Sequence, residues 1–260
     1  MSYVLVGCTY AILSVIMLPL YFRIIYVFWT QHKYRKFQSY FLIIQIGIAQ
    51  CGMAPGHGFT GLAVALQNDH LNLGSFFIKV TAGTRRAEAL LSLALAYDRF
   101  QVICRSKKIP YLIDAISITA WIFGFLYFTL LCSPYADISI IPSTYTSACN
   151  ESLSATYLLE KVGTYSTLAA LAVTFLFYVA IVVTLIRHKL NMTFVQVSFN
   201  EKIILLQAVV RFLGDSSMTL LYHIIPEFVG QNDWMSIFTH AGYVFNNVTL
   251  PPILFLVICK

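Results

Sequence analysis

The stretch LALAYDRFQVICRSKK, Leu93 to Lys108, joins two kinds of sequence that are seldom adjacent. An apolar helical run ends at Asp98-Arg99-Phe100, and a basic cluster of Arg105, Lys107 and Lys108 follows. An ionisable pair in or beside an apolar medium needs water or a partner. We therefore place this point at the edge of an apolar phase, and the rest of the chain indicates which phase that is.

The composition indicates lipid. Of the 260 residues, 58% are hydrophobic and 11% are charged, and the mean hydropathy is +0.75. Soluble domains carry about 25% charged residues. Too few charges are present to cover a globular surface, so the surplus apolar surface is expected to face a bilayer.

Seven apolar runs are long enough to cross a bilayer as helices, at 1.5 Å per residue. They lack the alternation of barrel strands, and the first has no cleavage-site pattern, so we interpret it as a span rather than a signal peptide. The sequence predicts an all-α membrane protein with a single seven-transmembrane helix domain. The spans are about Val4–Phe28, Ser39–Leu66, Phe76–Tyr97, Tyr111–Leu131, Val162–Ile186, Ile203–Ile225 and Trp234–Ile258.

The connectors alternate in charge, which predicts the orientation. Most of the 17 basic residues fall on one set of loops, and the opposite loops are acidic. The positive-inside rule makes the basic side cytoplasmic and places the N-terminus outside. The net charge of +6 therefore reflects topology and contact with anionic lipid, and no basic patch indicates nucleic-acid binding. The basic residues on the predicted cytoplasmic side are Lys33, Arg35, Lys36, Arg99, Arg105, Lys107, Lys108, Arg187, Lys189, Lys202 and Lys260. The acidic residues of the opposite loops are Asp69, Asp137, Glu151, Glu160, Glu227 and Asp233.

A glycosylation sequon, Asn150-Glu-Ser152, lies in the longest outer connector. We expect a glycan at Asn150. The sequons at Asn191 and Asn247 fall in a cytoplasmic loop and inside the seventh span, so neither is expected to be used.

Three stretches resemble a known family: Leu18-Pro-Leu-Tyr-Phe-Arg23 before a short basic loop, Phe37-Gln-Ser-Tyr-Phe41 at the start of the second span, and Leu95-Ala-Tyr-Asp-Arg-Phe100. With seven spans, the chain resembles a rhodopsin-like G-protein-coupled receptor. More narrowly, it is similar to the nematode serpentine chemoreceptors of the class G, T, V and X superfamily, with class V the best match. The resemblance implies a plasma-membrane receptor, typically of a sensory cell, for a small molecule, with a heterotrimeric G protein as its cytoplasmic partner.

The resemblance also assigns roles. In the family, the Arg of the triplet is held by the neighbouring acid at rest and is released on activation to contact the G protein. In this chain the resemblance assigns these two roles to Arg99 and Asp98. Glu201, at the base of the sixth span, is a candidate second partner for Arg99. The alternative is that the pair only caps a helix at the interface. In the family, a disulfide joins the outer end of the third span to the long outer loop, where Cys149 lies in this chain. No cysteine is present at Asn68–Ser75, so Cys132 is the candidate partner of Cys149.

Ionisable residues lie inside the third and sixth spans: Arg85, Arg86, Glu88, Arg211 and Asp215. Each costs at least about 2.5–3.5 kcal/mol on insertion scales, so each is a functional hypothesis. Arg85 and Glu88 share a helix face, as do Arg211 and Asp215. Arg86 lies about 100° round the helix from Arg85, and we expect Asp215 to be its partner.

These charges are placed at the depth where the resembled receptors hold ligands. Counting 1.5 Å per residue from Arg99 puts Glu88 about 16 Å and Arg85 about 21 Å above the cytoplasmic end. The cluster carries a net positive charge, which favours a small anion such as a carboxylate; an ion-pair network that fixes helix packing is the open alternative. Further candidate ligand contacts, which packing also explains, are His57, Tyr165, His223 and Tyr243.

Other classes of protein fit less well. A seven-span odorant channel of the insect type has its N-terminus inside, and a transporter is expected to show a repeat. No zinc-protease, phosphate-loop or nucleophile-elbow motif indicates an enzyme, a metal or a cofactor, and the seventh span has no Lys for retinal. The loose motifs and the end of the chain just after the seventh span leave open a receptor remnant that does not signal.

Overall fold

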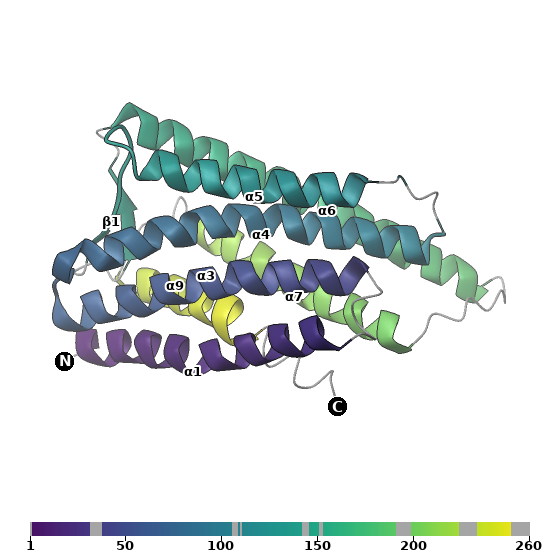
Figure 1. Ribbon diagram of the computed structural model, residues 1–260, viewed down its shortest axis with the longest axis horizontal. Helices are drawn as coiled ribbons and strands as arrows, with labels where there is room; N and C mark the ends of the chain where they lie inside the picture. The colour runs from purple at the N-terminus through teal and green to yellow at the C-terminus, as the bar shows by residue number, and fades with distance from the viewer. Residues whose placement is uncertain are drawn as a thin grey trace.

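The computed structural model describes residues 2–31, 38–105, 109, 111–141, 146–150, 153–190, 199–223 and 233–250. The described residues form a bundle of seven long α-helices (Figure 1), so the predicted fold class is confirmed. The helices are α1 (Ser2–Thr30), α3 (Gln38–Leu66), α4 (Leu73–Ile103), α5 (Leu112–Leu131), α6 (Ser154–Leu190), α7 (Phe199–His223) and α9 (Asp233–Val244). Among the described residues, α1, α5 and α6 are long and apolar enough to cross a membrane by length and composition alone.

Several helix ends differ from the predicted spans; α6, for example, begins at Ser154 rather than at Val162. Helix α4 continues past Asp98 and Arg99 to Ile103, because the backbone ladder does not need apolar side chains and the Cys104 N–H still donates to the Phe100 carbonyl oxygen. After α9, the chain continues as a π-helical segment, η3 (Phe245–Thr249), rather than as one regular helix. The end of the predicted seventh span, 251–258, lies outside the described residues.

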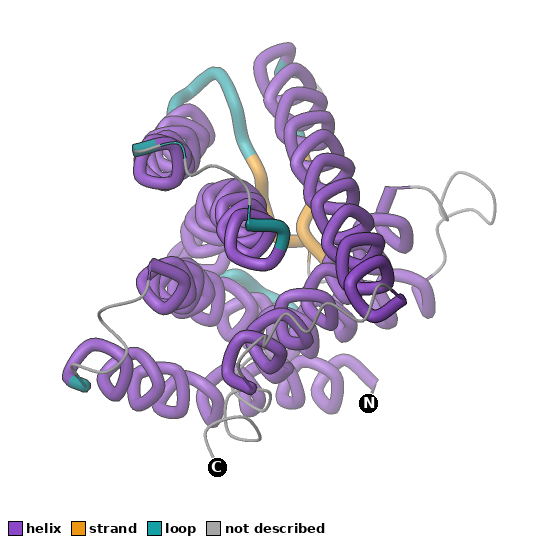
Figure 2. The backbone as a smooth tube through the Cα atoms, turned by 90° about the vertical axis from the view of Figure 1, so that its right-hand side faces the viewer, coloured by secondary structure: helices purple, strands orange, loops and turns teal. Residues whose placement is uncertain are grey.

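Helix α4 is the centre of the bundle and contacts α3, α5, α6 and α7 (Figure 2). Its approach to α5 depends on two glycines. A Cβ built on Gly124 would lie 2.7 Å from the Gly83 carbonyl oxygen, and a Cβ on Gly83 would meet the Gly124 carbonyl oxygen at the same distance. Small residues of this kind let helix backbones approach closely inside a membrane.

Gly124→Ala is expected to lower the stability of the bundle by about 1–3 kcal/mol, the usual cost of overpacking. The new methyl group meets backbone atoms and the Ala87 Cβ, which cannot move without shifting a helix. Gly58→Ala is the control, because a Cβ there meets only the Ser14 side chain at 3.5 Å. The measurement is the thermal unfolding midpoint of each purified variant in detergent. Equal midpoints for Gly124→Ala and Gly58→Ala would contradict the packing described.

The outer connector between α5 and α6 forms a two-stranded antiparallel hairpin. Strand β1 (Ile138–Ile141) pairs with β2 (Thr146–Cys149), and the hairpin lies at the same end of the bundle as the N-terminus (Figure 1). Lys79 on α4 holds Asp137 at 2.7 Å, and the Ser75 hydroxyl accepts a hydrogen bond from the Ile140 N–H. A short 3-10 segment, η1 (His70–Asn72), joins α3 to α4 beneath it.

The cysteine and the asparagine predicted to be modified both lie at this outer end. Cys132, at the end of α5, is an exposed free thiol, so the predicted bond to Cys149 is not made in this structure. The polar contacts of Ser75, Lys79 and Asp137 connect the hairpin to α4 instead. Asn150 is exposed directly after β2, and its glycosylation remains a prediction.

Candidate functional site

Three groups of buried polar side chains are arranged at successive depths along α4, and each includes at least one residue of that helix. The first, at the inner end, is the cytoplasmic cluster: Ser39, Asp98 and Arg99. The Asp98 carboxylate accepts hydrogen bonds from Arg99 at 2.6 and 3.1 Å and from the Ser39 hydroxyl at 2.6 Å. Arg99 also contacts the Ser39 hydroxyl. Both charged side chains are only 5% exposed, so the guanidinium lies inside the bundle rather than in solvent.

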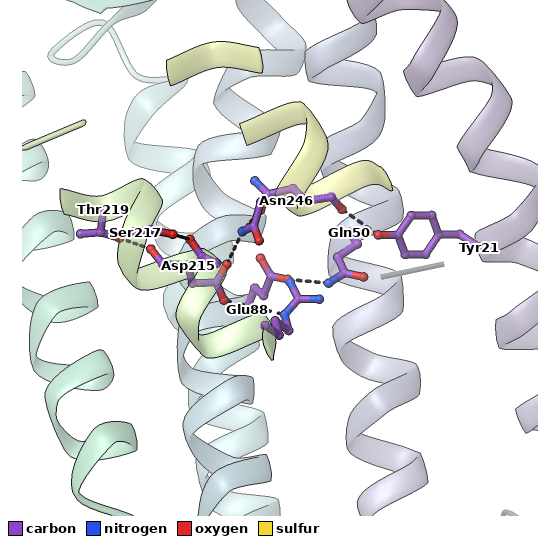
Figure 3. A network of polar contacts seen from close by, with 10 residues as sticks. Tyr21, Gln50, Glu88, Asp215, Ser217, Thr219 and Asn246 are labelled. Carbon is purple, nitrogen blue, oxygen red and sulfur yellow. Dashed lines mark hydrogen bonds and ion pairs between the residues drawn. The ribbon is translucent and has the colours of Figure 1, made fainter. Parts of the chain in front are cut away.

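The second group is the central network, which connects α1, α3, α4, α7 and η3 (Figure 3). Glu88 forms an ion pair with Arg211 and accepts a hydrogen bond from the Gln50 amide at 2.8 Å. Arg211 lies 3.8 Å from Asp215, one turn along α7, measured from Nε to Oδ2. Asp215 in turn accepts a hydrogen bond from the Asn246 amide at 2.7 Å.

The network is closed on the α1 side by a backbone contact. The Tyr21 hydroxyl donates to the Asn247 carbonyl oxygen at 2.7 Å. This carbonyl belongs to the π-helical segment η3, where the regular backbone ladder is interrupted. One chain of polar contacts therefore connects five elements at mid-bundle.

The third group is a pair of arginines nearer the outer end. Arg85 donates to the Tyr243 hydroxyl at 2.7 Å and lies over its ring. Arg86 points toward the other side of α4, where it donates to the Thr167 hydroxyl at 2.6 Å and lies 5.2 Å from the centre of the Tyr127 ring. Space for Arg86 comes from Gly163, where a Cβ would lie 2.7 Å from its guanidinium.

A cavity lies between α4, α6, α7 and α9, and its empty space together with its opening to solvent amounts to about 660 Å³. Arg85 and Tyr243 line its outer part, Glu88 and Asp215 its middle, and Ser92 its inner part. Apolar side chains fill much of the wall between these polar residues. They are Ala89, Leu95, Leu171, Ala208, Phe212 and Met218.

The structure changes the predicted pairing of the buried charges. The prediction that Asp215 is the partner of Arg86 is wrong, because Arg86 lies on the side of α4 that faces α5 and α6, whereas Asp215 lies on α7. Glu88 pairs with Arg211 on another helix rather than with Arg85 on its own.

The remaining predicted residues lie in different places. His57 is buried against His240, with their ring centres 5.4 Å apart, and does not line the cavity. Tyr165 is 65% exposed on α6, so it faces away from the bundle interior. Glu201 and His223 lie on α7, and their side chains fall outside the part of the chain that the structure describes.

Several polar residues that the sequence did not single out join these groups: Ser39, Ser92, Tyr127, Thr167 and Asn246. Apart from Ser39, which stands in the Phe37-Gln-Ser-Tyr-Phe41 stretch, each is a common residue type with no motif of its own, so its place in the bundle is visible only once the helices are packed. Gln50 on α3 also joins them, because its side-chain amide donates to Glu88.

No family model matches the chain, and no curated protein sequence matches it either. Among solved structures, the crystal structure of squid rhodopsin has the same architecture. Its TM-score is 0.77 at 13% sequence identity, and the match covers 98% of this chain and 81% of that one. The chain therefore has the seven-helix fold of squid rhodopsin, and among the described residues three of its helices are long and apolar enough to cross a membrane.

Proposed function

We propose that this protein is a chemosensory G-protein-coupled receptor of the plasma membrane. It binds a small anionic molecule from the outer side and activates a heterotrimeric G protein on the cytoplasmic face. The resemblance to nematode serpentine chemoreceptors supports the sensory role, and the rhodopsin-type fold supports coupling to a G protein. The protein is not an enzyme and uses no cofactor.

The observation that carries the proposal is the arrangement of the cytoplasmic cluster. An interfacial helix cap would leave Arg99 in water, but the guanidinium is buried and held by Asp98 on its own helix and Ser39 on α3. Among the described residues, the hydrogen bonds of Arg99 go to Asp98 and Ser39. A buried arginine held by side chains that can separate from it is the arrangement that a switch requires, because its release exposes a cation at the cytoplasmic end of the bundle. The same observation favours a receptor over a channel or a transporter.

The proposed ligand charge follows from Arg86. Both acids of the buried cluster contact Arg211. Among the described residues, no carboxylate forms an ion pair with Arg86, and its buried Nε has no hydrogen-bond partner. A guanidinium in a low-dielectric interior attracts an anion, and it grips a carboxylate through two parallel hydrogen bonds.

The packing alternative applies to a different part of the charge cluster. Glu88, Arg211 and Asp215 form an internal network that fixes α4 against α7. Arg86 lies outside this network, so its charge is not needed to balance either acid. A receptor remnant with the same fold would keep the network and lose the response to ligand, which the experiments below separate.

Arg86→Lys is expected to weaken the response to a small carboxylic acid about tenfold to a hundredfold, and Arg86→Ala to weaken it more. Lysine keeps the charge but loses the planar fork, and a hydrogen bond to a charged group contributes about 1.5–3 kcal/mol. The measurement is a dose–response curve and the surface level on the same cells.

The matched control is Arg23→Lys, at an exposed position on α1, which is expected to leave the curve unchanged. Normal surface expression of Arg86→Ala with an unshifted response would rule out a direct role for Arg86. Loss of surface expression in Arg86→Lys as well as Arg86→Ala would show that Arg86 acts in packing.

A further inference from the structure

Two buried histidines, His57 on α3 and His240 on α9, lie against each other outside the cavity. Their ring centres are 5.4 Å apart, and the ring planes meet at 72°. His57 is 4% exposed and His240 is 7% exposed, so both rings are shielded from solvent. Counted at 1.5 Å per residue from the end of α3 at Leu66 and the start of α9 at Asp233, both lie about 10–14 Å below the outer end of the bundle.

The ring nitrogens of this pair lack the hydrogen bonds that buried polar atoms usually make. Among the described residues, both nitrogens of His57 and Nε2 of His240 have no hydrogen-bond partner. The ring of Tyr10 packs 4.7 Å from the His240 ring, and its hydroxyl donates to the Ile237 carbonyl oxygen. Buried polar atoms nearly always bind a partner, so these three nitrogens are available to a ligand from outside the chain.

Packing alone accounts for this pair less well. No hydrogen bond joins the two rings, because neither nitrogen of His57 has a partner. An N–H that lies against the face of an aromatic ring makes a weak contact. Such a contact serves at most one of the three nitrogens, and the other two stay without a partner.

The spacing of the rings fits a metal ion held by one nitrogen of each. Zn²⁺ binds imidazole nitrogen at about 2.0–2.1 Å and arranges its ligands as a tetrahedron. The ion then lies about 3.2 Å from each ring centre, and the tetrahedral angle places the two ring centres about 5.2 Å apart. The observed distance is 5.4 Å, whereas a linear two-coordinate ion at the same bond length would hold the centres about 6.4 Å apart.

We infer that His57 and His240 form a zinc-binding site that joins α3 to α9. Neutral imidazole is the form that binds a metal, and an unpaired charge on a buried ring is costly, so both rings are expected to be neutral. His57 has no hydrogen bond that fixes its ring, so it can turn either nitrogen toward His240.

The two histidines make an exchangeable site rather than a closed structural one. Among the residues that the structure describes, no group of three or more His, Cys, Asp and Glu side chains could hold a metal ion. The protein therefore supplies two of the four zinc ligands and leaves the other two positions to water or a small anion. The site is independent of the proposed ligand charge, because neither histidine lines the cavity. Zinc is expected to restrain α9 and to stabilise this arrangement of the helices.

The test measures the unfolding midpoint of the purified full chain in detergent, with excess zinc chloride and with EDTA. A ligand that binds only the folded state, at ten times its Kd, is expected to raise the midpoint of a chain of this size by about 3–6 °C. Magnesium chloride at the same concentration is the control, since Mg²⁺ prefers oxygen ligands, and it is expected to give no rise. Cys8 and Cys132 are exposed thiols that can also bind zinc, so every protein carries Cys8→Ser and Cys132→Ser.

His57→Phe and His240→Phe separate a metal site from packing. Each removes ring nitrogens that have no partner and keeps an aromatic ring, so in EDTA each is expected to unfold at or above the midpoint of the parent. In zinc each is expected to lose the rise, because one imidazole remains. His57→Gln gives the same comparison without adding volume. His188→Phe, on α6, is the control and is expected to keep the full rise.

A zinc-dependent rise that is lost in both histidine variants, with one zinc bound per chain by equilibrium dialysis, supports the site. No rise in the parent protein overturns it. A rise that survives in His57→Phe, His57→Gln or His240→Phe places the zinc elsewhere and also overturns it. Variants that lose several degrees in EDTA and keep the zinc-dependent rise show that the two rings act in packing alone.

Discussion

Asp98→Asn is expected to raise signalling without ligand about tenfold, and Arg99→Ala to abolish coupling while the protein still reaches the cell surface. The Asp98 carboxylate accepts from Arg99 and from Ser39, so the neutral amide weakens the contact that keeps the guanidinium buried. A hydrogen bond to a charged group contributes about 1.5–3 kcal/mol, and about 1.4 kcal/mol corresponds to a tenfold change in an equilibrium. The measurement is second-messenger output per receptor at the surface.

Ser39 provides an independent check of this switch. Ser39→Ala removes the α3 partner without changing any charge, so it is expected to raise basal signalling less than Asp98→Asn does. Ser117→Ala, a buried hydroxyl on α5 that donates to its own helix, is the matched control. If Asp98→Asn and Arg99→Ala both signal like the parent, the cluster is only a cap at the membrane interface.

Arg211→Ala is expected to cost about 3–5 kcal/mol of stability, because it leaves the buried Glu88 carboxylate without its ion pair. The remaining contact, from the Gln50 amide, is neutral and cannot replace a guanidinium. The double variant Glu88→Leu with Arg211→Met removes both charges and is expected to recover most of the loss, since apolar replacements of buried ion pairs are often neutral or stabilising.

The measurement for this network is the unfolding midpoint of each purified variant in detergent. Arg187→Met is the control, because Arg187 is exposed at the inner end of α6. A stable Arg211→Ala variant would show that Glu88 is not held by this pair. A double variant as unstable as Arg211→Ala would mean that Asp215, rather than Glu88, is the acid left unpaired.

The sequence was sufficient to predict the helix bundle, because the hydrophobic runs that indicate membrane-spanning helices can be recognised along the chain alone. A run of about 20 apolar residues is visible without any knowledge of its neighbours. The first six predicted spans correspond to described helices over most of their length, and α9 covers the first part of the seventh. The predicted end of the third span, at Tyr97, was too early. Helix α4 continues through Asp98 and Arg99, which a hydropathy boundary does not show.

The partners of the buried charges could not be predicted in the same way, because they depend on how each helix is rotated. Arg86 and Glu88 are two residues apart, so they point to different sides of α4 and meet α6 and α7 respectively. The depth of Arg85 and Glu88 was predictable by counting from Arg99, and both line the cavity. Ser39 and Thr167 became visible only once their partners were placed.

The central claim, that an acid entering the bundle activates a G protein through Arg99, is tested most directly by nucleotide exchange on a purified heterotrimeric G protein. The receptor is supplied in lipid vesicles together with a panel of small carboxylic acids and their alcohols. We expect at least one acid to accelerate nucleotide exchange more than the corresponding alcohol does. The Arg86→Lys variant is expected to need a higher concentration of that acid, and Arg99→Ala is expected to give no exchange at any concentration. Acceleration by an acid that persists unchanged in Arg99→Ala, or no acceleration by any acid in the parent protein, would contradict the account.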